Sequence, residues 1–370
     1  MPGADSGPLN RPTVNRLAVV LFNLGGPDNP AAVEPFLFNL FNDPAILRLP
    51  TLLRWLLAKL ISRRRAPIAR KIYAHMGGGS PLLANTQAQA AALQAALKDA
   101  AGEARVFIAM RYWHPFAQET AKAVRDFSPD RILLLPLYPQ YSTTTTASSA
   151  ADWNQAAKTA GLTIPTQLIC CYPGEPGFLD ALTELARSAL AEAGRQAPAA
   201  KPFVIFSAHG LPEKIVKAGD PYAHEMRATV EPIVERLGLT PGDPIAGGLG
   251  DWDYGFQSRV GPMRWIGPWT DELVREAAED KRAIVILPVA FVSEHSETLV
   301  ELDIEYREMA QKLGAAAYIR APTVSTHPAF IAGLANIARA ALADGRPLVP
   351  FGSCGADSRL CPCKTGAGQA

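Results

Sequence analysis

The feature that most constrains the fold of this chain is an alternation of short, unbroken apolar runs with longer segments of helical pattern. The apolar runs end abruptly at glycine, proline or hydroxyl residues, as strands do when a parallel sheet is buried on both faces. They occupy residues 17–24, 106–112, 131–138, 166–172, 202–208, 283–291 and 316–321. Predicted helices include residues 86–101, 116–127, 222–237, 270–279 and 296–313. Strands that alternate with helices need crossover connections, so the pattern predicts an α/β fold with mostly parallel sheets.

A weak internal repetition indicates two lobes. Residues 17–27 (LAVVLFNLGGP) resemble residues 202–212 (PFVIFSAHGLP), and residues 132–142 (ILLLPLYPQYS) resemble residues 284–293 (IVILPVAFVS). A chain of 370 residues is also long enough for two domains of common size. We therefore predict two Rossmann-like or flavodoxin-like lobes, each a parallel sheet flanked by helices, with a cleft between them that strand ends line. The alternative, that any two strands of an α/β protein look alike, stays open here.

Composition and length set the expected domain organisation and exclude some functions. Hydrophobic residues at 48% and charged residues at 19% are typical of a globular enzyme. A net charge of +1 gives no reason to expect nucleic acid. No stretch reaches the length of a membrane span, so we expect a cytoplasmic protein with reduced cysteines. The predicted parts are a disordered N-terminus (1–15), a first lobe (16–172), a second lobe (173–325) and a C-terminal helix with a cysteine-bearing tail (326–370).

His209 is the first candidate for chemistry because it directly follows the apolar run 203–206. The carboxyl ends of parallel strands are where open α/β sheets bind ligands, and Gly210 and Pro212 predict a fixed turn there. A lone histidine is more often structural than catalytic, so this hypothesis requires a partner residue.

A set of glutamates after the strand at 283–291 could supply that partner. Glu294, Glu297 and Glu301 would share one stripe of a helix if Glu294 already begins it. Carboxylates stacked in this way raise one another's pKa unless a cation or a proton relay occupies the site. His295 lies off the stripe, and we expect it in the helix-capping turn as support. A solvated helix face is the competing interpretation.

Two further segments have ligand-binding patterns. Arg111, Tyr112, Trp113 and His114 end another predicted strand, and an arginine beside flat rings suits an aromatic ligand that bears carboxylates. Residues 50–65 (PTLLRWLLAKLISRRR) form a basic amphipathic helix, which indicates an interfacial segment on anionic lipid or the lip of an apolar pocket. Ordinary core and surface positions remain the alternative for both segments.

The cysteines are unevenly placed. Cys354, Cys361 and Cys363 fall within the last 17 residues, and Cys170 and Cys171 end a predicted strand. Clustered thiolates in a reduced compartment indicate metal or iron–sulfur ligands before disulfides, although this spacing matches no common zinc pattern. The spacing of the cysteines by itself fits free thiols as well as it fits a metal or iron–sulfur cluster.

Taken together, the motifs resemble those of the ferrochelatase family. Residues 207–212 (SAHGLP) with residues 219–222 (GDPY) resemble the family signature. Other blocks resemble the family in the same order, at residues 23–27, 77–82, 111–115, 138–142, 257–262 and 297–299. The resemblance runs nearly the whole chain and implies a two-lobed chelatase fold. It also implies insertion of Fe²⁺ into protoporphyrin IX, the last step of heme biosynthesis, with release of two protons.

The resemblance implies a set of site residues. His209 and Glu297 would be the central catalytic pair, which face each other across the porphyrin cleft and bind the Fe²⁺ substrate. Glu294 would be a further catalytic carboxylate. The expected substrate-binding residues are Asn23, Leu24, Tyr73, Ser80, Arg111, Tyr112, Tyr138, Ser258, Trp265, Phe291 and His295. Residues 47–61 would form a hydrophobic lip at a membrane surface, where an upstream protoporphyrinogen oxidase is the expected partner.

The resemblance also bears on the cysteines and on the alternatives. It implies a [2Fe–2S] cluster held by Cys354, Cys361, Cys363 and one of Cys170 and Cys171. Three positions depart from the family pattern: Glu294 where many relatives have Asp, Phe256 where Trp is familiar, and Leu24 where some have Met. A coproporphyrin ferrochelatase, a chelatase for another metal and a non-catalytic porphyrin carrier stay open.

Overall fold

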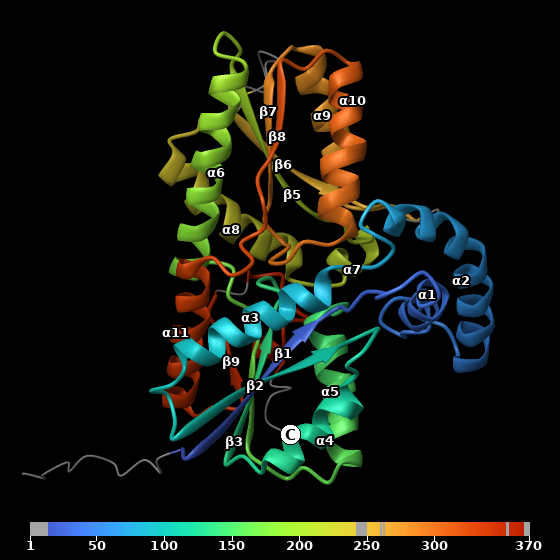
Figure 1. Cartoon of the computed structure of the whole chain (residues 1–370), viewed down its shortest axis with the longest axis vertical. Coiled ribbons are helices and arrows are strands. Elements are labelled where there is room, and N and C mark those ends of the chain that lie inside the picture. The colour runs from blue at the N-terminus through green and yellow to red at the C-terminus, as the bar shows by residue number, and fades with distance from the viewer. Residues whose placement is uncertain (1–13, 242–249, 260, 262, 353–354, 366–370) are drawn as a thin grey trace, which may run out of the picture.

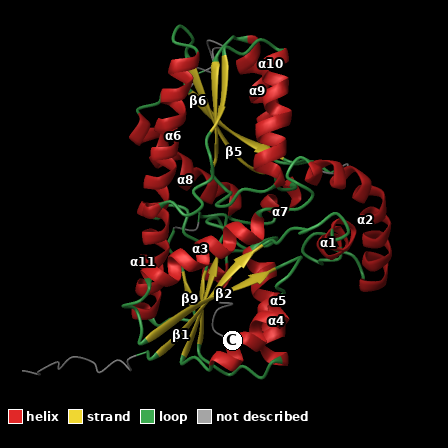
Figure 2. Cartoon of the chain, in the orientation of Figure 1, coloured by secondary structure: helices red, strands yellow, loops and turns green. Residues whose placement is uncertain are grey.

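Two parallel sheets lie one above the other along the long axis of the molecule (Figure 1). The structure is a computed structural model, and it describes residues 14–241, 250–259, 261, 263–352 and 355–365. Helices cover both sheets, so each sheet with its helices forms a lobe (Figure 2). The predicted α/β fold with two parallel-sheet lobes is confirmed.

The first sheet has the strand order β2-β1-β3-β4-β9, and all of its pairings are parallel. Its strands are β1 (Arg16–Asn23), β2 (Glu103–Met110), β3 (Arg131–Pro136), β4 (Thr166–Ile169) and β9 (Leu348–Val349). The helices between its first four strands are α1 (Val33–Phe41), α2 (Thr51–Ala74), α3 (Leu82–Ala96), α4 (Ala117–Phe127) and α5 (Thr146–Thr159). Strand β1 is buried along nearly its whole length, as its apolar sequence predicts.

The second sheet has the order β6-β5-β7-β8 and is also parallel throughout. Its strands are β5 (Pro202–His209), β6 (Trp252–Gln257), β7 (Ala283–Pro288) and β8 (Ala317–Arg320). The remaining helices are α6 (Pro176–Gln196), α7 (Glu213–Lys217), α8 (Tyr222–Leu237), α9 (Thr270–Glu279), the π-helix η1 (Glu297–Glu305), α10 (Tyr306–Lys312), α11 (Pro328–Asp344) and α12 (Pro362–Thr365).

Leaving β9 aside, the two sheets have the same topology. Strand β1 lies between β2 and β3, as β5 lies between β6 and β7. The two pairs of similar sequences noted above begin in β1 and β5, and in β3 and β7. The internal repetition therefore corresponds to equivalent strands of the two lobes.

The sequence analysis missed strands β6 and β9. Strand β6 has the sequence WDYGFQ, whose polar residues and glycine hide the apolar pattern at a sheet edge. Strand β9 has only two residues, too few to show any periodicity. Because β9 pairs with β4, the chain after α11 returns to the first sheet. The prediction for residues 326–370 was a helix and a tail, with no strand.

The predicted disordered N-terminus falls almost entirely on residues that the structure does not describe. Residues 1–13 lie outside the described residues. Asn15, in contrast, donates its N–H to a carboxylate oxygen of Asp130 (2.9 Å) and accepts a hydrogen bond from the N–H of Glu103 (2.7 Å). Asn15 is therefore part of the first lobe.

Helices α1 and α2 project to one side of the two sheets (Figure 1). The predicted helix 50–65 continues to Ala74, and its leucines face solvent: 71% of Leu52, 52% of Leu56 and 46% of Leu60 are exposed. The alternative of a plain core helix is therefore wrong for these residues. Among the helices that the structure describes, none combines the length and apolarity needed to cross a bilayer.

Helix α6 is packed closely against the start of α11. A Cβ atom on Gly177, near the start of α6, would lie 2.3 Å from the carbonyl oxygen of Ala329. Since that oxygen belongs to backbone, no side-chain rotation can relieve the overlap, and one helix would have to move.

We expect Gly177→Ala to lower the free energy of unfolding by about 1–3 kcal/mol, because it forces this helix pair apart. Gly194, in the same helix, has open space around it, so Gly194→Ala should be neutral or stabilise by up to about 1 kcal/mol. Denaturant unfolding of both variants measures the difference. Equal stability would contradict the close contact.

Candidate active site

His209 ends strand β5, as predicted, and a hydrogen bond at Nδ1 fixes the orientation of its ring. The Nδ1–H of His209 donates to the carbonyl oxygen of Gly210 (2.6 Å). The N–H of Gly210 in turn donates to the carbonyl oxygen of Gln257 (2.9 Å), and the hydroxyl of Tyr222 donates to the carbonyl oxygen of His209 (3.0 Å). A carbonyl oxygen can only accept, so in the neutral ring Nδ1 carries the proton and Nε2 carries the lone pair.

Glu297 lies between two imidazoles. Its Oε1 is 3.6 Å from Nε2 of His209, and its Oε2 is 3.6 Å from Nε2 of His295. The structure thus brings together the two residues that the sequence analysis expected as a central pair. The gap between the two side chains is too narrow for a porphyrin. A planar ring between them would need about 7 Å, one van der Waals contact on each face, so a macrocycle could enter only if the side chains moved apart.

Two neighbouring glutamates have opposite pKa shifts. Burial alone would raise the pKa of Glu297, but His209 and His295 outweigh it and lower the pKa to about 2. Burial and the charge of Glu297 raise the pKa of Glu301, although hydrogen bonds from Ser258 and Tyr306 oppose this. Pairs of carboxylates whose pKa values are driven apart are characteristic of acid–base sites.

Glu294 does not share the stripe that was predicted for it. Helix η1 begins at Glu297, so Glu294 precedes the helix. Its Oε1 lies 2.9 Å from Nη1 of Arg320, which is 9% exposed, and accepts a hydrogen bond from the N–H of Thr323 (3.0 Å). The prediction of three stacked glutamates is wrong for this residue, because a buried arginine from β8 draws it away.

His295 lies in the turn that precedes η1, as expected. Its carbonyl oxygen accepts hydrogen bonds from the N–H groups of Thr298 (3.2 Å) and Leu299 (2.9 Å). Its ring packs against Phe291, with 4.7 Å between ring centroids. This turn is what directs Nε2 of His295 at Glu297.

Three more of the expected substrate-binding residues join this site. Tyr73, at the end of α2, is hydrogen-bonded to Ser296, and burial raises its pKa to about 12. Ser258 has a left-handed backbone (φ 66°), and its N–H and hydroxyl both donate to Glu301. The ring of Trp265 lies 6.3 Å from that of His209. A strained non-glycine backbone such as that of Ser258 is often found at functional sites.

The other expected substrate-binding residues make their described contacts within the first lobe. Arg111 lies 2.9 Å from a carboxylate oxygen of Asp43 and donates to the hydroxyl of Ser148 (2.8 Å), and the hydroxyl of Tyr112 also donates to Asp43 (2.8 Å). Four members of this group remain. Asn23 donates a hydrogen bond to Thr86, Leu24 is partly buried and packs against the apolar core, Ser80 lies just before α3, and Tyr138 is buried. Sequence reasoning missed Asp43, because nothing in its local pattern relates it to Arg111.

A second cluster is formed by cysteines. The sulfur atoms of Cys170, Cys361 and Cys363 lie within 4.8 Å of one another, and among the residues that the structure describes no other group of three His, Cys, Asp or Glu does so. Hydrogen bonds with Cys171 first, and then with Cys361 and Cys363, raise the pKa of Cys170. Cys171 instead lies beside Glu225 and Gly352, and Cys354 is outside the described residues. Of the two adjacent cysteines, Cys170 is therefore the one grouped with the tail.

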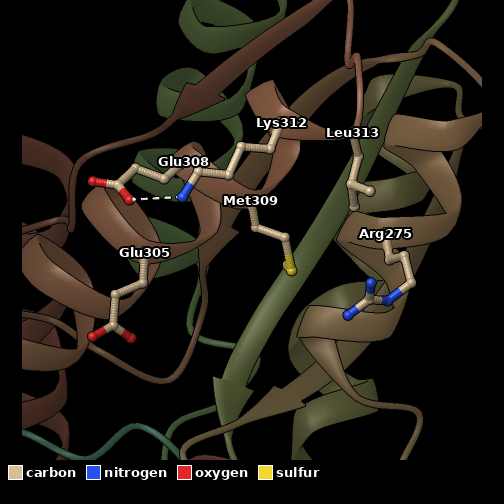
Figure 3. Close-up of a pocket in the computed structure, with 6 residues that line it drawn as sticks. All are labelled: Arg275, Glu305, Glu308, Met309, Lys312 and Leu313. Carbon is tan, nitrogen blue, oxygen red and sulfur yellow. Dashed lines mark hydrogen bonds and ion pairs between the residues drawn. The ribbon is translucent and has the colours of Figure 1, made fainter.

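Two surface hollows lie away from His209. One of about 510 Å³, between α1 and α2, is lined by Ala31, Glu34, Pro35, Phe38, Asn39, Trp55, Lys59, Ser62 and Arg70. The other, of about 350 Å³, is lined by the six residues in Figure 3, among which Glu308 and Lys312 form an ion pair (3.4 Å). Glu305, the last residue of η1, is one of the six, so the acidic side chains of this helix extend from the active site to the outer surface.

Comparison with known proteins points to one family. A family model described as Ferrochelatase matches residues 16–342. Proteins named Ferrochelatase from Caulobacter vibrioides (strain NA1000 / CB15N) and Phenylobacterium zucineum (strain HLK1) are 49% and 50% identical to the chain, over 95% of it and 99% of each relative. The solved structure of SirB from Bacillus subtilis with Fe3+ is similar in fold, with a TM-score of 0.51 at 11% identity over 90% of this chain and 98% of that chain.

We expect His209→Ala to raise the pKa of Glu297 above its value of about 2, because the substitution removes the first of the two groups that oppose the effect of burial. A ¹³C NMR titration of labelled glutamate carboxyl carbons measures this, with exposed Glu192 of α6 as the unchanged reference. In the unsubstituted protein this carboxylate contributes stability above about pH 4.5 that is lost as the pH falls toward 2. An unchanged titration of Glu297 in the variant would refute the ion-pair arrangement.

Proposed function

The chain belongs to the ferrochelatase family, and on that premise we propose that it inserts Fe²⁺ into protoporphyrin IX, forming protoheme and releasing two protons in the last step of heme biosynthesis. The observation that supports this most directly is the approach of His209 and Glu297 to 3.6 Å at the carboxyl end of β5. An imidazole beside a carboxylate supplies both a proton acceptor and metal ligands, which are the two requirements of metal insertion into a ring with N–H groups.

His209 is the proposed base. In its neutral form the lone pair is on Nε2, which faces Glu297, while the bond from Nδ1 to Gly210 keeps the ring from turning. When Nε2 accepts a pyrrole proton, the imidazolium that forms is stabilised by the carboxylate at 3.6 Å, and it must pass this proton on toward solvent before Nε2 can accept the second. One lone pair serves one task at a time, so His209 cannot bind Fe²⁺ and accept a proton in the same step.

Glu297 is the proposed metal-binding carboxylate for the Fe²⁺ substrate. A carboxylate with a pKa of about 2 is a weak base, so it stays ionised and available to a divalent cation. Nε2 of His209 could be a second ligand only before it accepts a pyrrole proton, so the protein leaves most positions of the ion open to water and to the porphyrin nitrogens. A substrate ion must pass from the protein to the porphyrin, and a site with few protein ligands releases it more readily.

Glu301 and Glu305 are the proposed route for protons toward solvent. Glu301 follows Glu297 along η1 and has a raised pKa, so it takes up a proton more readily than Glu297 does. Glu305 follows four residues later in η1 and lines the surface hollow in Figure 3. Glu294 supports the site from outside it, through its ion pair with Arg320.

The porphyrin is proposed to bind between the two lobes. On the second lobe Ser258, Trp265, Phe291 and His295 surround the pair, and Tyr73 reaches it from α2. On the first lobe the proposed contacts are Asn23, Leu24, Ser80, Arg111, Tyr112 and Tyr138.

Turnover tests this function and separates it from its alternatives. With Fe²⁺ under reducing conditions, kcat/KM should be about tenfold or more higher for protoporphyrin IX than for coproporphyrin, whose extra carboxylates would lose hydration at an apolar lip. His209→Ala should lower kcat by about 10²–10⁴-fold while porphyrin binding, followed by fluorescence, persists. Reversed porphyrin preference would favour a coproporphyrin enzyme, and binding without turnover by the unsubstituted protein would favour a carrier.

We also propose that the cysteine cluster holds a [2Fe–2S] centre, with Cys170, Cys361, Cys363 and Cys354 as ligands. The donor set fits, because the thiol of Cys170, just after β4, and two thiols of the tail already converge within 4.8 Å and such centres take four cysteines. When bound, the centre would supply a one-electron redox couple and a link between the tail and the first lobe.

The expected consequence is a visible absorption spectrum typical of an iron–sulfur protein. Cys170→Ser should abolish it, whereas Cys171→Ser, its matched neighbour, should retain it, because the Cys171 sulfur lies toward Glu225. Absence of such bands from protein purified without air, or their loss in Cys171→Ser alone, would contradict the assignment.

A membrane-surface role for α2 is the third proposal, which implies a cytoplasmic enzyme with peripheral attachment. Within the described residues, seven of the eight exposed large apolar side chains lie between Leu49 and Ile68. Residues 47–74 also carry eight Lys or Arg and no Asp or Glu. An apolar face with a basic flank is suited to anionic lipid, and there the enzyme could receive porphyrin from a protoporphyrinogen oxidase.

Leu52→Glu with Leu56→Glu should therefore weaken binding to vesicles that contain anionic lipid by about tenfold or more, since two apolar side chains are replaced by charged ones. Raising the salt concentration should weaken binding of the unsubstituted protein as well. Met263→Glu, at an exposed apolar residue outside α2, is the control and should bind normally. Equal vesicle binding by all three proteins would exclude the lip as the membrane contact.

A further inference from the structure

A buried glutamine of the first lobe holds the loop that carries half of the active site. Gln89 lies on α3 and has no exposed surface. Its Nε2 donates to the carbonyl oxygens of Val292 (2.9 Å) and Ser325 (3.0 Å), and its Oε1 accepts from the hydroxyl of Ser293 (2.8 Å). These partners belong to the second lobe, in the loops that follow β7 and β8. One side chain therefore ties two active-site loops to the opposite lobe.

The contact continues directly to the catalytic pair. The carbonyl oxygen of Ser293, whose hydroxyl donates to Gln89, accepts a hydrogen bond from the Nδ1–H of His295 (3.2 Å). This bond leaves Nε2 of His295 to face Glu297 at 3.6 Å. The orientation of the His295 ring thus depends on where the Ser293 backbone lies.

A second side chain on the same face of α3 acts on the same loop. Asn85, one turn before Gln89, donates its Nδ2–H to the carbonyl oxygen of Glu294 (3.1 Å). Carbonyls on both sides of Ser293 are therefore bonded by amides from the first lobe. Helix α3, which lies across the first sheet in Figure 1, therefore holds this loop at two points one helical turn apart.

We propose that Gln89 is a positioning residue for metal insertion, which holds the loop 292–295 so that His295 contacts Glu297 opposite His209. The inference rests on the proposed roles of those three residues. Replacing Gln89 by an apolar side chain would leave two carbonyl oxygens and one hydroxyl unpaired in a buried place, so the loop would shift to satisfy them. A displacement of about 1 Å at a reacting group can cost about 10²-fold in rate.

A general role in holding the lobes together is the competing explanation, and the chain offers a matched comparison. Gln140 is also buried and also crosses between the lobes, where its Nε2 donates to the hydroxyl of Thr229 (2.8 Å) and to the carbonyl oxygen of Val289 (3.2 Å). Neither partner contacts His295. Gln140→Met therefore removes an equivalent bond between lobes without releasing the loop.

The experiment compares Gln89→Met, Gln140→Met and the exposed Gln87→Met on α3. The midpoint temperature of thermal unfolding should fall by similar amounts in the first two variants. Only Gln89→Met should lower kcat for Fe²⁺ insertion, by about 10–100-fold, while KM for porphyrin changes less than about twofold. Ser293→Ala should give a smaller loss, and combining it with Gln89→Met should add little, because both act on one contact. Equal kcat for Gln89→Met and Gln140→Met would overturn the proposal.

A second measurement does not depend on turnover. In ¹⁵N NMR spectra of labelled histidine, His295 should be protonated at Nδ1 in the unsubstituted protein and should show mixed tautomers in Gln89→Met. If Gln89→Met does not fold, Ser293→Ala and Asn85→Ala replace it, and unchanged His295 signals with unchanged kcat in both would overturn the inference. Failure of the unsubstituted protein to insert Fe²⁺ would refute the proposed function instead, whatever the tautomer.

Discussion

Two parallel sheets meet at their carboxyl-terminal edges, and the active site depends on this arrangement. Crossover connections place every strand of a parallel sheet in one direction, so all the functional loops leave from a single edge. Because the edges face each other, the residues that follow β5 and β7 lie against loops and helices of the first lobe. His209 ends β5 and Glu297 begins η1, after the neighbouring strand β7, so the parallel order of the second sheet brings the two together.

The junction of the lobes is held by buried polar side chains as well as by apolar packing. Gln89 and Gln140 cross it with their amides, and Asp220 accepts hydrogen bonds from the N–H and hydroxyl of Thr143 (both 2.7 Å). Hydrogen bonds have direction, so they fix position more closely than apolar contacts do. The proposed active site takes residues from both lobes and so requires that accuracy, because a small relative shift would separate its parts.

Electrostatics gives three glutamates, close together in the chain, three different environments. Glu297 lies between two imidazoles and stays ionised, Glu301 is buried beside that charge and holds a proton more tightly, and Glu294 pairs with Arg320. The residue type is the same in each case. What differs is the set of charges within a few ångströms, which the fold provides.

The amino-acid sequence by itself determined every strand but β6 and β9, the repeat of the two lobes and the position of His209 at a strand end, because apolar runs and turn residues act locally. Its motifs also indicated Glu297 as the partner. Only the tertiary structure decided that Glu294 turns to Arg320, that Cys170 rather than Cys171 joins the tail, and that Gln89 holds the loop before η1. Each of these depends on which distant group lies about 3 Å away, and local sequence patterns carry no record of such distances.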